Sequence, residues 1–264
     1  MKIVKILSAF SLVILLFNSC SKDRPLVLFS VDNDIELGKK TVAEIASMPS
    51  KFKILDSASN AASYQYLYKI RNKILNSGKV YFKDKFEWKL FIIQDDSTLN
   101  AFCTPGGYIY VYTGLLKYLK EEDHLAGVLG HEMAHADRRH TSRSLQTQYG
   151  ISVLLDVVLG NNPSVLKEIA GGIYTLKNSR EHETEADEYS VIFLCPTDYL
   201  ADGASGFFKQ LIKDGYDCET SAFFSTHPNS CDRVDKITAK KVELGCSGSG
   251  TFASEYAVFK SKLP

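Results

Sequence analysis

The 264-residue sequence has no charge excess of either sign, no internal repeats and no long hydrophobic run. Its 31 basic side chains balance its 31 acidic ones, so there is no surplus of positive charge to neutralise the phosphates of a nucleic acid. The apolar run Ile6–Phe17 has 12 residues, fewer than the roughly 20 that a membrane-spanning helix needs. These absences argue against nucleic-acid-binding and multispan membrane proteins, and they favour one globular domain.

Histidine is also scarce, with six in the chain, yet two of them lie four residues apart in His131-Glu132-Met133-Ala134-His135. Residues four apart on a helix share one face, so both imidazoles can reach one metal ion with Glu132 beside it. The pattern is typical of zinc metalloproteases, in which the glutamate acts as a general base. The plain alternative is two histidines that cap or fill a helix face.

A catalytic zinc takes three protein ligands, so one more ligand must come from elsewhere in the chain. The segment Ser179–Asp187 is rich in acids, and its Glu183 and Asp187 are four residues apart on one helix face. One of them could bind the metal while the other accepts the ring N–H of a liganding histidine. Glu185 is a competing candidate that faces about 200° around the helix from Glu183. An ordinary solvated acidic helix face is the alternative.

Taken together, these segments resemble the gluzincin zinc peptidases of metallopeptidase family forty-eight, which includes HtpX-like, BepA-like and CAAX prenyl endopeptidases. The resemblance covers roughly residues 34–241. It implies Glu183 as the third zinc ligand, because the family places that ligand four residues before the aspartate of an E-x-x-A-D sequence. It also implies that Asp187 orients His131. The chain looks like a small lipoprotein member of this family.

A further element of the resemblance is Thr226-His227-Pro228, which is followed five residues later by Arg233. It is similar to the family's T-H-P-x-x-x-x-R element. The resemblance implies that His227 comes close to the metal, where it stabilises the reacting oxyanion or occupies the open coordination position. Arg233 would be its anchoring or anion-facing partner. Without the other elements, His227-Pro228 would be interpreted as a loop-to-helix junction.

Upstream, Pro105-Gly106-Gly107 predicts a turn between two β-rich segments, Asn100–Cys103 and Tyr108–Tyr112. The resemblance implies that Asn100–Cys103 is an edge strand beside the metal, to which unfolded or misfolded substrates add as an extra strand. Cys103 stands where the family usually has a small apolar residue. We expect a buried free thiol there, and a redox-sensitive thiol near zinc is the alternative.

The fold class that we expect is α+β: a mainly helical gluzincin (zincin) metallopeptidase domain over residues 34–246, with a small β-sheet whose edge strand borders the active-site cleft. Apolar periodicity predicts several further elements. They are helices over 34–45, 64–75, 122–139 and 151–159, another helix around Phe207–Ile212, and a strand over 88–93. Residues 151–159 are expected to form a core or lid helix, or to lean on a membrane surface. Residues 247–264, which begin with Ser-Gly-Ser-Gly, are expected to be a flexible C-terminal tail.

The N-terminus indicates export. Two lysines precede the apolar run, as in a signal peptide over residues 1–19, and Asn18-Ser19-Cys20 resembles a bacterial lipoprotein cleavage site with the lipid on Cys20. Phe17 stands where leucine would be usual. Ser21 resembles the residue found in lipoproteins that are sent to the outer membrane. The expected location is the bacterial cell envelope, lipid-anchored on the periplasmic face, with residues 20–33 as a tether.

Five cysteines follow Cys20, and an exported chain permits disulfides. Four of them could form two bridges in any of three connectivities, which would leave Cys103 unpaired. These four are Cys195, Cys218, Cys231 and Cys246. We expect at least one bridge, which would tie the C-terminal part to the Glu183 helix.

The resulting prediction is a zinc-dependent endopeptidase that holds one Zn²⁺ per chain and cleaves unfolded or misassembled envelope proteins. Its metal ligands would be His131, His135 and Glu183, and its catalytic residues Glu132, Asp187 and His227. The rival interpretation is a zinc-binding chaperone-like module, or a latent peptidase in which His227 blocks the metal. The intact glutamate of the motif argues against a vestigial site, and the lack of long apolar spans argues against a prenyl endopeptidase.

Overall fold

The computed structural model describes residues 28–216, 227 and 232–264, and the predicted signal peptide, Cys20, Cys218 and Cys231 lie outside them. The elements described are, in chain order, α2 (Val31–Ala46), α3 (Ala61–Leu75), β1 (Lys89–Ile93), β2 (Ala101–Thr104), β3 (Tyr108–Tyr112), α4 (Thr113–Tyr118), α5 (Glu122–Asp137), α6 (His140–Tyr149), α7 (Ile151–Leu159), α8 (Pro163–Gly172), the 3₁₀ turn η1 (Ile173–Thr175), α9 (Arg180–Leu194), α10 (Gly203–Lys213), α12 (Arg233–Glu243) and α13 (Ala253–Lys260).

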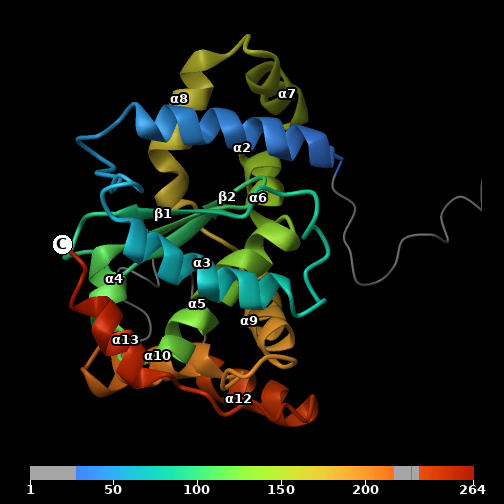
Figure 1. Ribbon diagram of the computed structural model, residues 1–264. Helices are drawn as coiled ribbons and strands as arrows, with labels where there is room; N and C mark the ends of the chain where they lie inside the picture. The colour runs from blue at the N-terminus through green and yellow to red at the C-terminus, as the bar shows by residue number, and fades with distance from the viewer. Residues whose placement is uncertain (1–27, 217–226, 228–231) are drawn as a thin grey trace, which may run out of the picture.

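A small mixed sheet separates two helical layers (Figure 1), with α2, α7 and α8 on one side and α3, α5 and α9 on the other. The strand order is β1-β3-β2, with β1 parallel and β2 antiparallel to the central strand β3. All five side chains of β3 are buried, because alternate residues of a strand point to opposite faces and helices cover both faces of this sheet. Its tyrosines face the α2 side and its Ile109 and Val111 the α5 side. The predicted α+β class is confirmed, and β2 is an edge of this sheet.

The motif helix α5 lies at the centre of the lower layer, where α9 and α10 pack against it. Small residues allow this packing: a Cβ atom added to Gly127 would lie 2.1 Å from the backbone nitrogen of Ala204 in α10. The Ser190 hydroxyl of α9 donates a hydrogen bond of 2.8 Å to the Gly127 carbonyl. α9 and α10 therefore pack closely against α5 and bury its second half, which carries the His131–His135 motif.

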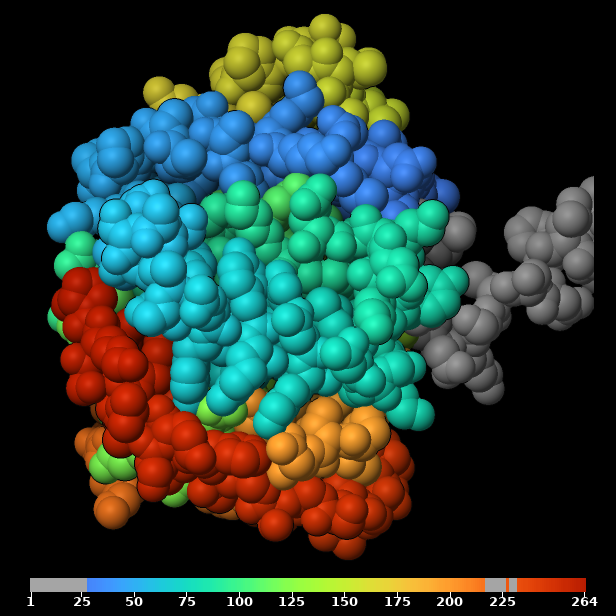
Figure 2. Space-filling model, viewed as in Figure 1, coloured from blue at the N-terminus to red at the C-terminus, as the bar shows by residue number. Residues whose placement is uncertain are grey.

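The C-terminal segment differs from the expected flexible tail. Gly250 forms a β-bridge with Tyr199, and residues 253–260 form α13, whose Tyr256 and Phe259 are buried against Tyr66 of α3. Figure 2 shows the C-terminal end lying along the α3 region of the molecular surface. The prediction was wrong because a glycine-serine joint says nothing about which surface the following aromatic residues can cover.

Two other boundaries also shift. α2 begins at Val31, inside the expected tether, because the Ser30 side chain accepts a hydrogen bond from the backbone of Asn33 and caps the helix. The motif helix ends at Asp137 rather than at residue 139, because Arg139 has a positive φ of 60°. Residues 151–159 form α7 as predicted. Within the described part of the chain, every helix is too short or too polar to cross a membrane.

One disulfide is present among the described residues. It joins Cys195, at the end of α9, to Cys246, after α12. The expectation of at least one bridge is confirmed, and this bridge ties the α9 helix to the C-terminal part of the chain. Cys103 is a buried free cysteine, as expected. Burial raises the pKa of its thiol well above its ordinary value, so the alternative of a reactive thiolate is not supported.

Candidate metal centre

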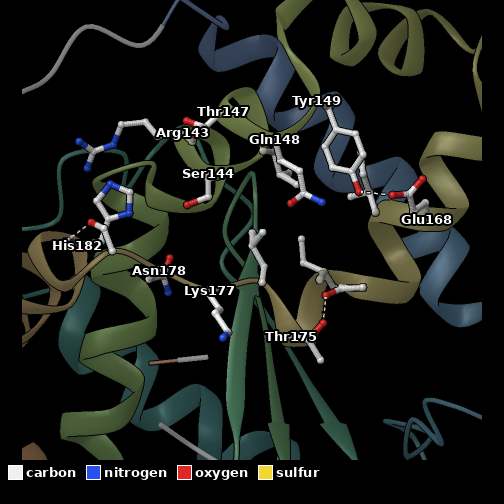
Figure 3. A pocket seen from close by; sticks show the side chains of 16 residues that line it. Arg143, Ser144, Thr147, Gln148, Tyr149, Glu168, Thr175, Lys177, Asn178 and His182 are labelled. Atoms are coloured by element: carbon white, nitrogen blue, oxygen red, sulfur yellow. Dashed lines mark hydrogen bonds between the residues drawn. The ribbon is translucent and has the colours of Figure 1, made fainter. Parts of the chain in front are cut away.

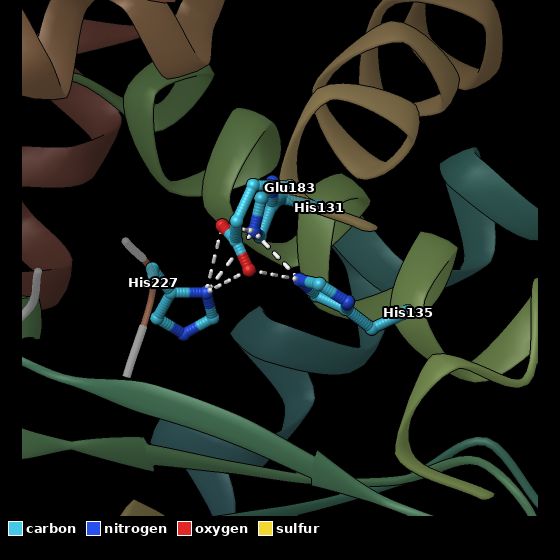
Figure 4. A group of neighbouring side chains, drawn as sticks. All are labelled: His131, His135, Glu183 and His227. Atoms are coloured by element: carbon cyan, nitrogen blue, oxygen red, sulfur yellow. Dashed lines mark hydrogen bonds and ion pairs between the residues drawn. The ribbon is translucent and has the colours of Figure 1, made fainter. Parts of the chain in front are cut away.

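The two motif histidines project from one face of α5 into the same small volume (Figure 4). Their Nε2 atoms lie 2.9 Å apart. Both residues are buried, because α5 is enclosed by α9, α10 and the sheet. The spacing of four residues therefore produces the convergence that the sequence predicted.

The third predicted ligand comes from α9. The Ser179 side chain caps this helix by accepting a hydrogen bond from the backbone of His182, so Glu183 falls in the first turn. Its carboxylate oxygens lie 3.2 Å from Nε2 of His131 and 3.2 Å from Nε2 of His135. Burial alone would raise the pKa of Glu183, but the surrounding histidines outweigh burial and hold it well below its usual value.

A fourth donor, His227, completes the group. Its Nδ1 lies 3.1 Å from a Glu183 oxygen and 3.3 Å from Nε2 of His131, and all four donor atoms lie within 4.8 Å of one another. Ligands about 2.0 Å from a tetrahedral zinc ion stand about 3.3 Å apart. The observed separations of 2.9–3.3 Å match this spacing, so the buried nitrogen and oxygen donors fit a zinc ion.

Asp187 lies one helical turn beyond Glu183, as predicted. Its Oδ1 is 2.9 Å from Nδ1 of His131, and the Arg233 guanidinium donates hydrogen bonds of 2.6 and 2.7 Å to its two oxygens. Burial alone would raise the pKa of Asp187, but Arg233 and His131 outweigh burial and lower it. A charged Asp187 can therefore accept the Nδ1 proton of His131 and leave Nε2 free for a metal.

Glu132 is buried next to the donors without being one of them. Its Oε1 accepts no hydrogen bond from the described residues, and it lies 3.5 Å from Nε2 of His227. Burial raises the pKa of Glu132, and the nearby His227 and His131 oppose this shift only partly. A buried carboxylate that has a raised pKa and one oxygen without a hydrogen-bond partner is placed to accept a proton.

The space in front of Glu132 is small in this structure. It is a cavity of about 20 Å³, which is room for about one water molecule. Its lining includes Cys103 of β2, Thr141 of α6, His227 and the segment 173–178. A larger pocket of about 910 Å³ lies beside it (Figure 3), between α6, α8 and the residues before α9. The two share Ile173, Leu176 and Asn178, so this segment forms the wall between them.

Two residues near the metal centre make contacts that the sequence did not predict. Glu185, the competing ligand candidate, faces away from the four donors, and its Oε2 lies 2.9 Å from Nε2 of His140. His140 in turn contacts His135, since their Nδ1 atoms are 2.8 Å apart. The only available signal was a further histidine five residues after the HExxH motif, because the contact depends on the turn at Arg139.

The sequence is similar to those of several known proteins. Residues 62–241 match peptidase family M48, which is more than half of the chain. The mitochondrial metalloendopeptidase OMA1 of Schizosaccharomyces pombe is 31% identical over 160 residues, covering 57% of this chain and 46% of that protein. Metalloprotease YcaL of Escherichia coli is 30% identical over 158 residues, covering 57% and 60%.

Metalloprotease LoiP of Escherichia coli is 25% identical over 207 residues, covering 75% of this chain and 78% of its own length. The chain thus spans less than two thirds of OMA1 and YcaL, and more of LoiP. All three relatives are named as metalloproteases or metalloendopeptidases. These names agree with the four buried donors on α5, α9 and residue 227. The chain belongs to peptidase family M48.

Proposed function

We propose that this protein is a zinc-dependent metalloendopeptidase. The observation that carries the proposal is the convergence of His131, His135 and Glu183 at tetrahedral spacing, beside Glu132, whose Oε1 has no hydrogen-bond partner among the described residues. Three protein ligands and one exchangeable position are typical of catalytic zinc sites, whereas structural sites are closed by four fixed ligands. A basic glutamate has no purpose in a purely structural site.

A zinc ion held there would polarise a peptide carbonyl and lower the pKa of a water molecule to about 7. Glu132 would take the proton of the attacking water and hand it to the leaving amine. Asp187 would keep His131 in the ligating tautomer. His227, whose Nε2 lies near both Glu132 and the Ala101 carbonyl, would stabilise the oxyanion that forms on the substrate.

Substrates would bind as an added strand along residues 100–103. In support, two carbonyls of β2 point away from β3 toward the cavity: that of Ala101 lies 3.5 Å from Nε2 of His227, and that of Cys103 accepts a hydrogen bond of 3.3 Å from Thr141. Main-chain pairing recognises an extended backbone rather than a particular side chain. Unfolded or misassembled chains are therefore the substrate class that we propose.

The proposed place of action is the bacterial cell envelope, with a lipid on Cys20 as the anchor. The name of one Escherichia coli relative, "beta-barrel assembly-enhancing protease" (25% identical over 158 residues), agrees with this. Replacement of Cys20 by serine should abolish incorporation of labelled fatty acid and release the protein from the membrane fraction. Unchanged labelling of the Cys20→Ser chain would contradict lipidation without touching the enzymatic proposal.

The catalytic proposal is tested with Glu132→Gln. Because glutamine cannot accept the proton, cleavage of an unfolded casein substrate should fall by at least about 100-fold, while one zinc per chain is retained. Glu181→Gln, an exposed glutamate on the same helix as Glu183, serves as the matched control and should cleave as the wild type does. Activity that survives Glu132→Gln would refute the mechanism.

A second candidate is a latent peptidase, which is favoured by the position of His227. Its Nδ1 stands at the fourth vertex of the donor group, and the cavity has no room for a peptide. In this form His227 would block the metal until a substrate displaces it. His227→Ala separates the two roles: a higher rate of casein cleavage supports latency, and a lower rate supports oxyanion stabilisation as the only role.

A further inference from the structure

Each of the two motif histidines has a buried partner on its second ring nitrogen, but the two partners differ in kind. His131 contacts the carboxylate of Asp187 directly. His135 contacts another imidazole, that of His140, with the two Nδ1 atoms 2.8 Å apart. Both of these rings are buried, and His140 is 0% exposed. When two ring nitrogens contact each other, either of them can carry the shared proton. A further group must therefore decide which nitrogen is the donor.

We propose that His140 and Glu185 form a positioning relay that fixes the proton of His135 on Nδ1 and so presents its Nε2 lone pair to the metal. The relay rests on the metal site proposed above and adds two residues to it. His140 and Glu185 do not touch the metal or the substrate. They act through His135.

The proton positions follow from what each group can donate or accept. A ligating imidazole nitrogen carries no proton, so the proton of His135 sits on Nδ1 and points at His140. His140 must then accept with its own Nδ1 and carry its proton on Nε2. That proton points at Glu185, whose Oε2 is 2.9 Å away. An ionised carboxylate can only accept a hydrogen bond. Glu185 therefore keeps the proton of His140 on Nε2, and this in turn keeps the proton of His135 on Nδ1.

The reversed arrangement shows why the carboxylate matters. If His140 carried its proton on Nδ1, His135 would have to carry its own on Nε2, where it would point at Nε2 of His131 and at Glu183. A proton there excludes a metal. The reversed arrangement would also leave Nε2 of His140 facing Glu185 without a proton between them, which is repulsive. Glu185 therefore discriminates between the two tautomers of a residue that it does not contact.

Glu185 is held as a charged acceptor by two arginines. Arg138 donates a hydrogen bond of 2.6 Å from Nε to its Oε1, and Arg143 lies 3.4 Å from its Oε2. Arg138 is itself packed over the ring of Tyr189. This arrangement parallels the other side of the site, where Arg233 holds Asp187. Three acids at alternate positions of α9 thus have distinct roles. Glu183 is a ligand, whereas Glu185 and Asp187 accept hydrogen bonds on either side of it.

The backbone brings His140 into place. Arg139, between α5 and α6, has a φ of 60°, a left-handed conformation that residues other than glycine seldom adopt. Its side chain is tied to Asp34 and to the Phe29 carbonyl of the α2 region. The resulting sharp turn starts α6 at His140 and folds the His140 ring back onto His135, one helical turn after the motif.

The alternative is that His140 only fills space. His182 offers a matched control, because its ring stacks on His140 with centroids 4.4 Å apart and an angle of 2° between the planes. It is packed like a relay member but lies outside the series of hydrogen bonds. Removal of His182 loosens the packing of His140 and leaves both partners of its ring nitrogens in place.

The experiment measures the zinc dissociation constant and the rate of zinc release to a chromogenic chelator, using the full chain. Loss of an outer partner of a zinc ligand typically weakens metal binding by about 10- to 100-fold. We expect that loss for His140→Leu, which removes acceptor and donor together. His140→Asn, whose amide oxygen can replace Nδ1 as the acceptor, should restore most of the affinity. His182→Ala should bind zinc as the wild type does.

Glu185→Gln tests the direction of the relay without a change of size, in case His140→Leu does not fold. An amide can donate as well as accept, so the reversed tautomer becomes accessible, and zinc binding should weaken by about 10-fold. The relay is refuted if the folded His140→Leu and Glu185→Gln chains hold zinc like the wild type. It is also refuted if His140→Asn is as weak as His140→Leu, or if His182→Ala matches the loss.

Failure of the metal site itself gives a different result. If the wild-type chain binds no zinc, or if His131→Ala binds it as tightly as the wild type, the proposed metal centre is wrong. If the wild type binds zinc, His131→Ala does not, and the His140 and Glu185 variants are unchanged, only the relay is wrong.

Discussion

At the scale of single residues, burial and charge conflict at Asp123. It lies in the first turn of α5, where the helix dipole favours an acid, yet it is 0% exposed and neither of its carboxylate oxygens accepts a hydrogen bond from the described residues. Burial, reinforced by the charge of Glu121, raises the pKa of Asp123 to about 7. Desolvation therefore outweighs the helix dipole at this position.

Because of the raised pKa of Asp123, we predict that the free energy of unfolding depends on pH. Because the folded chain holds this proton more tightly than the unfolded chain, the associated stability is present at low pH and is lost as the pH rises through about 7. Asp123→Asn should therefore raise the free energy of unfolding by about 1–2 kcal/mol at about pH 8.5, because the amide carries no buried charge, although it still lacks hydrogen-bond partners. At about pH 5.5 the gain should be about half as large, because the carboxyl is then protonated in the folded chain but already ionised in the unfolded chain.

Urea unfolding of both chains at the two pH values, with zinc held constant, provides the measurement. An equal difference in stability at the two pH values would show that Asp123 is not protonated in the folded chain at the lower one.

The residues of the metal centre divide into those that the sequence could predict and those that it could not. His131, Glu132, His135 and Glu183 follow from helix spacing, since residues four apart share a face whatever the surrounding fold. His140 does not, because its approach to His135 depends on the left-handed backbone at residue 139. That conformation is set by tertiary hydrogen bonds to the α2 region, and no local pattern encodes them.

At the scale of elements, the crossing of α5 and α10 places the motif helix. The backbones approach so closely at Gly127 and Ala204 that a methyl group at residue 127 would meet the Ala204 nitrogen at 2.1 Å. Backbone atoms cannot rotate out of the way as a flexible side chain can. A larger residue at this position must therefore move one helix relative to the other.

Gly127→Ala should lower the free energy of unfolding by about 1–3 kcal/mol, the usual cost of overpacking a core. It should also weaken zinc binding, because His131 follows one turn later on α5. The control is Gly172→Ala at the end of α8, where an added Cβ atom meets nothing within 4 Å. Its stability should stay within about 1 kcal/mol of the wild type.

Urea midpoints and zinc contents of the two alanine variants provide the comparison. If Gly127→Ala is as stable as Gly172→Ala, the close approach of α5 and α10 does not limit the fold.

Among elements, periodic helices were easier to predict than their partners. α3, α5 and α7 each carry an apolar pattern of their own, and the structure has helices at those positions. α13 was not predicted because only two of its residues, Tyr256 and Phe259, are buried. The surface that buries them is formed by α3, some 190 residues earlier in the chain, which explains why a local pattern was insufficient.

For the whole molecule, the metal centre connects parts of the chain that lie far apart in the sequence. Its donors come from α5, from α9 and from residue 227, and Asp187 extends the connection to Arg233 at the start of α12. The ring nitrogens of three buried imidazoles converge there with the buried carboxylate of Glu183. A metal that binds this folded arrangement but not the unfolded chain must stabilise the whole domain.

Removal of zinc should therefore lower the melting temperature of the entire chain in a single cooperative transition rather than loosen one loop. By mass action, free zinc at about 100 times its dissociation constant adds about 2.7 kcal/mol to the free energy of unfolding, and each further tenfold adds about 1.4 kcal/mol. Calorimetry over a series of buffered zinc concentrations measures this slope. A chain with both His131→Ala and His135→Ala should melt at one temperature throughout the series. If the wild-type chain also melts independently of zinc, the four donors do not form a metal site.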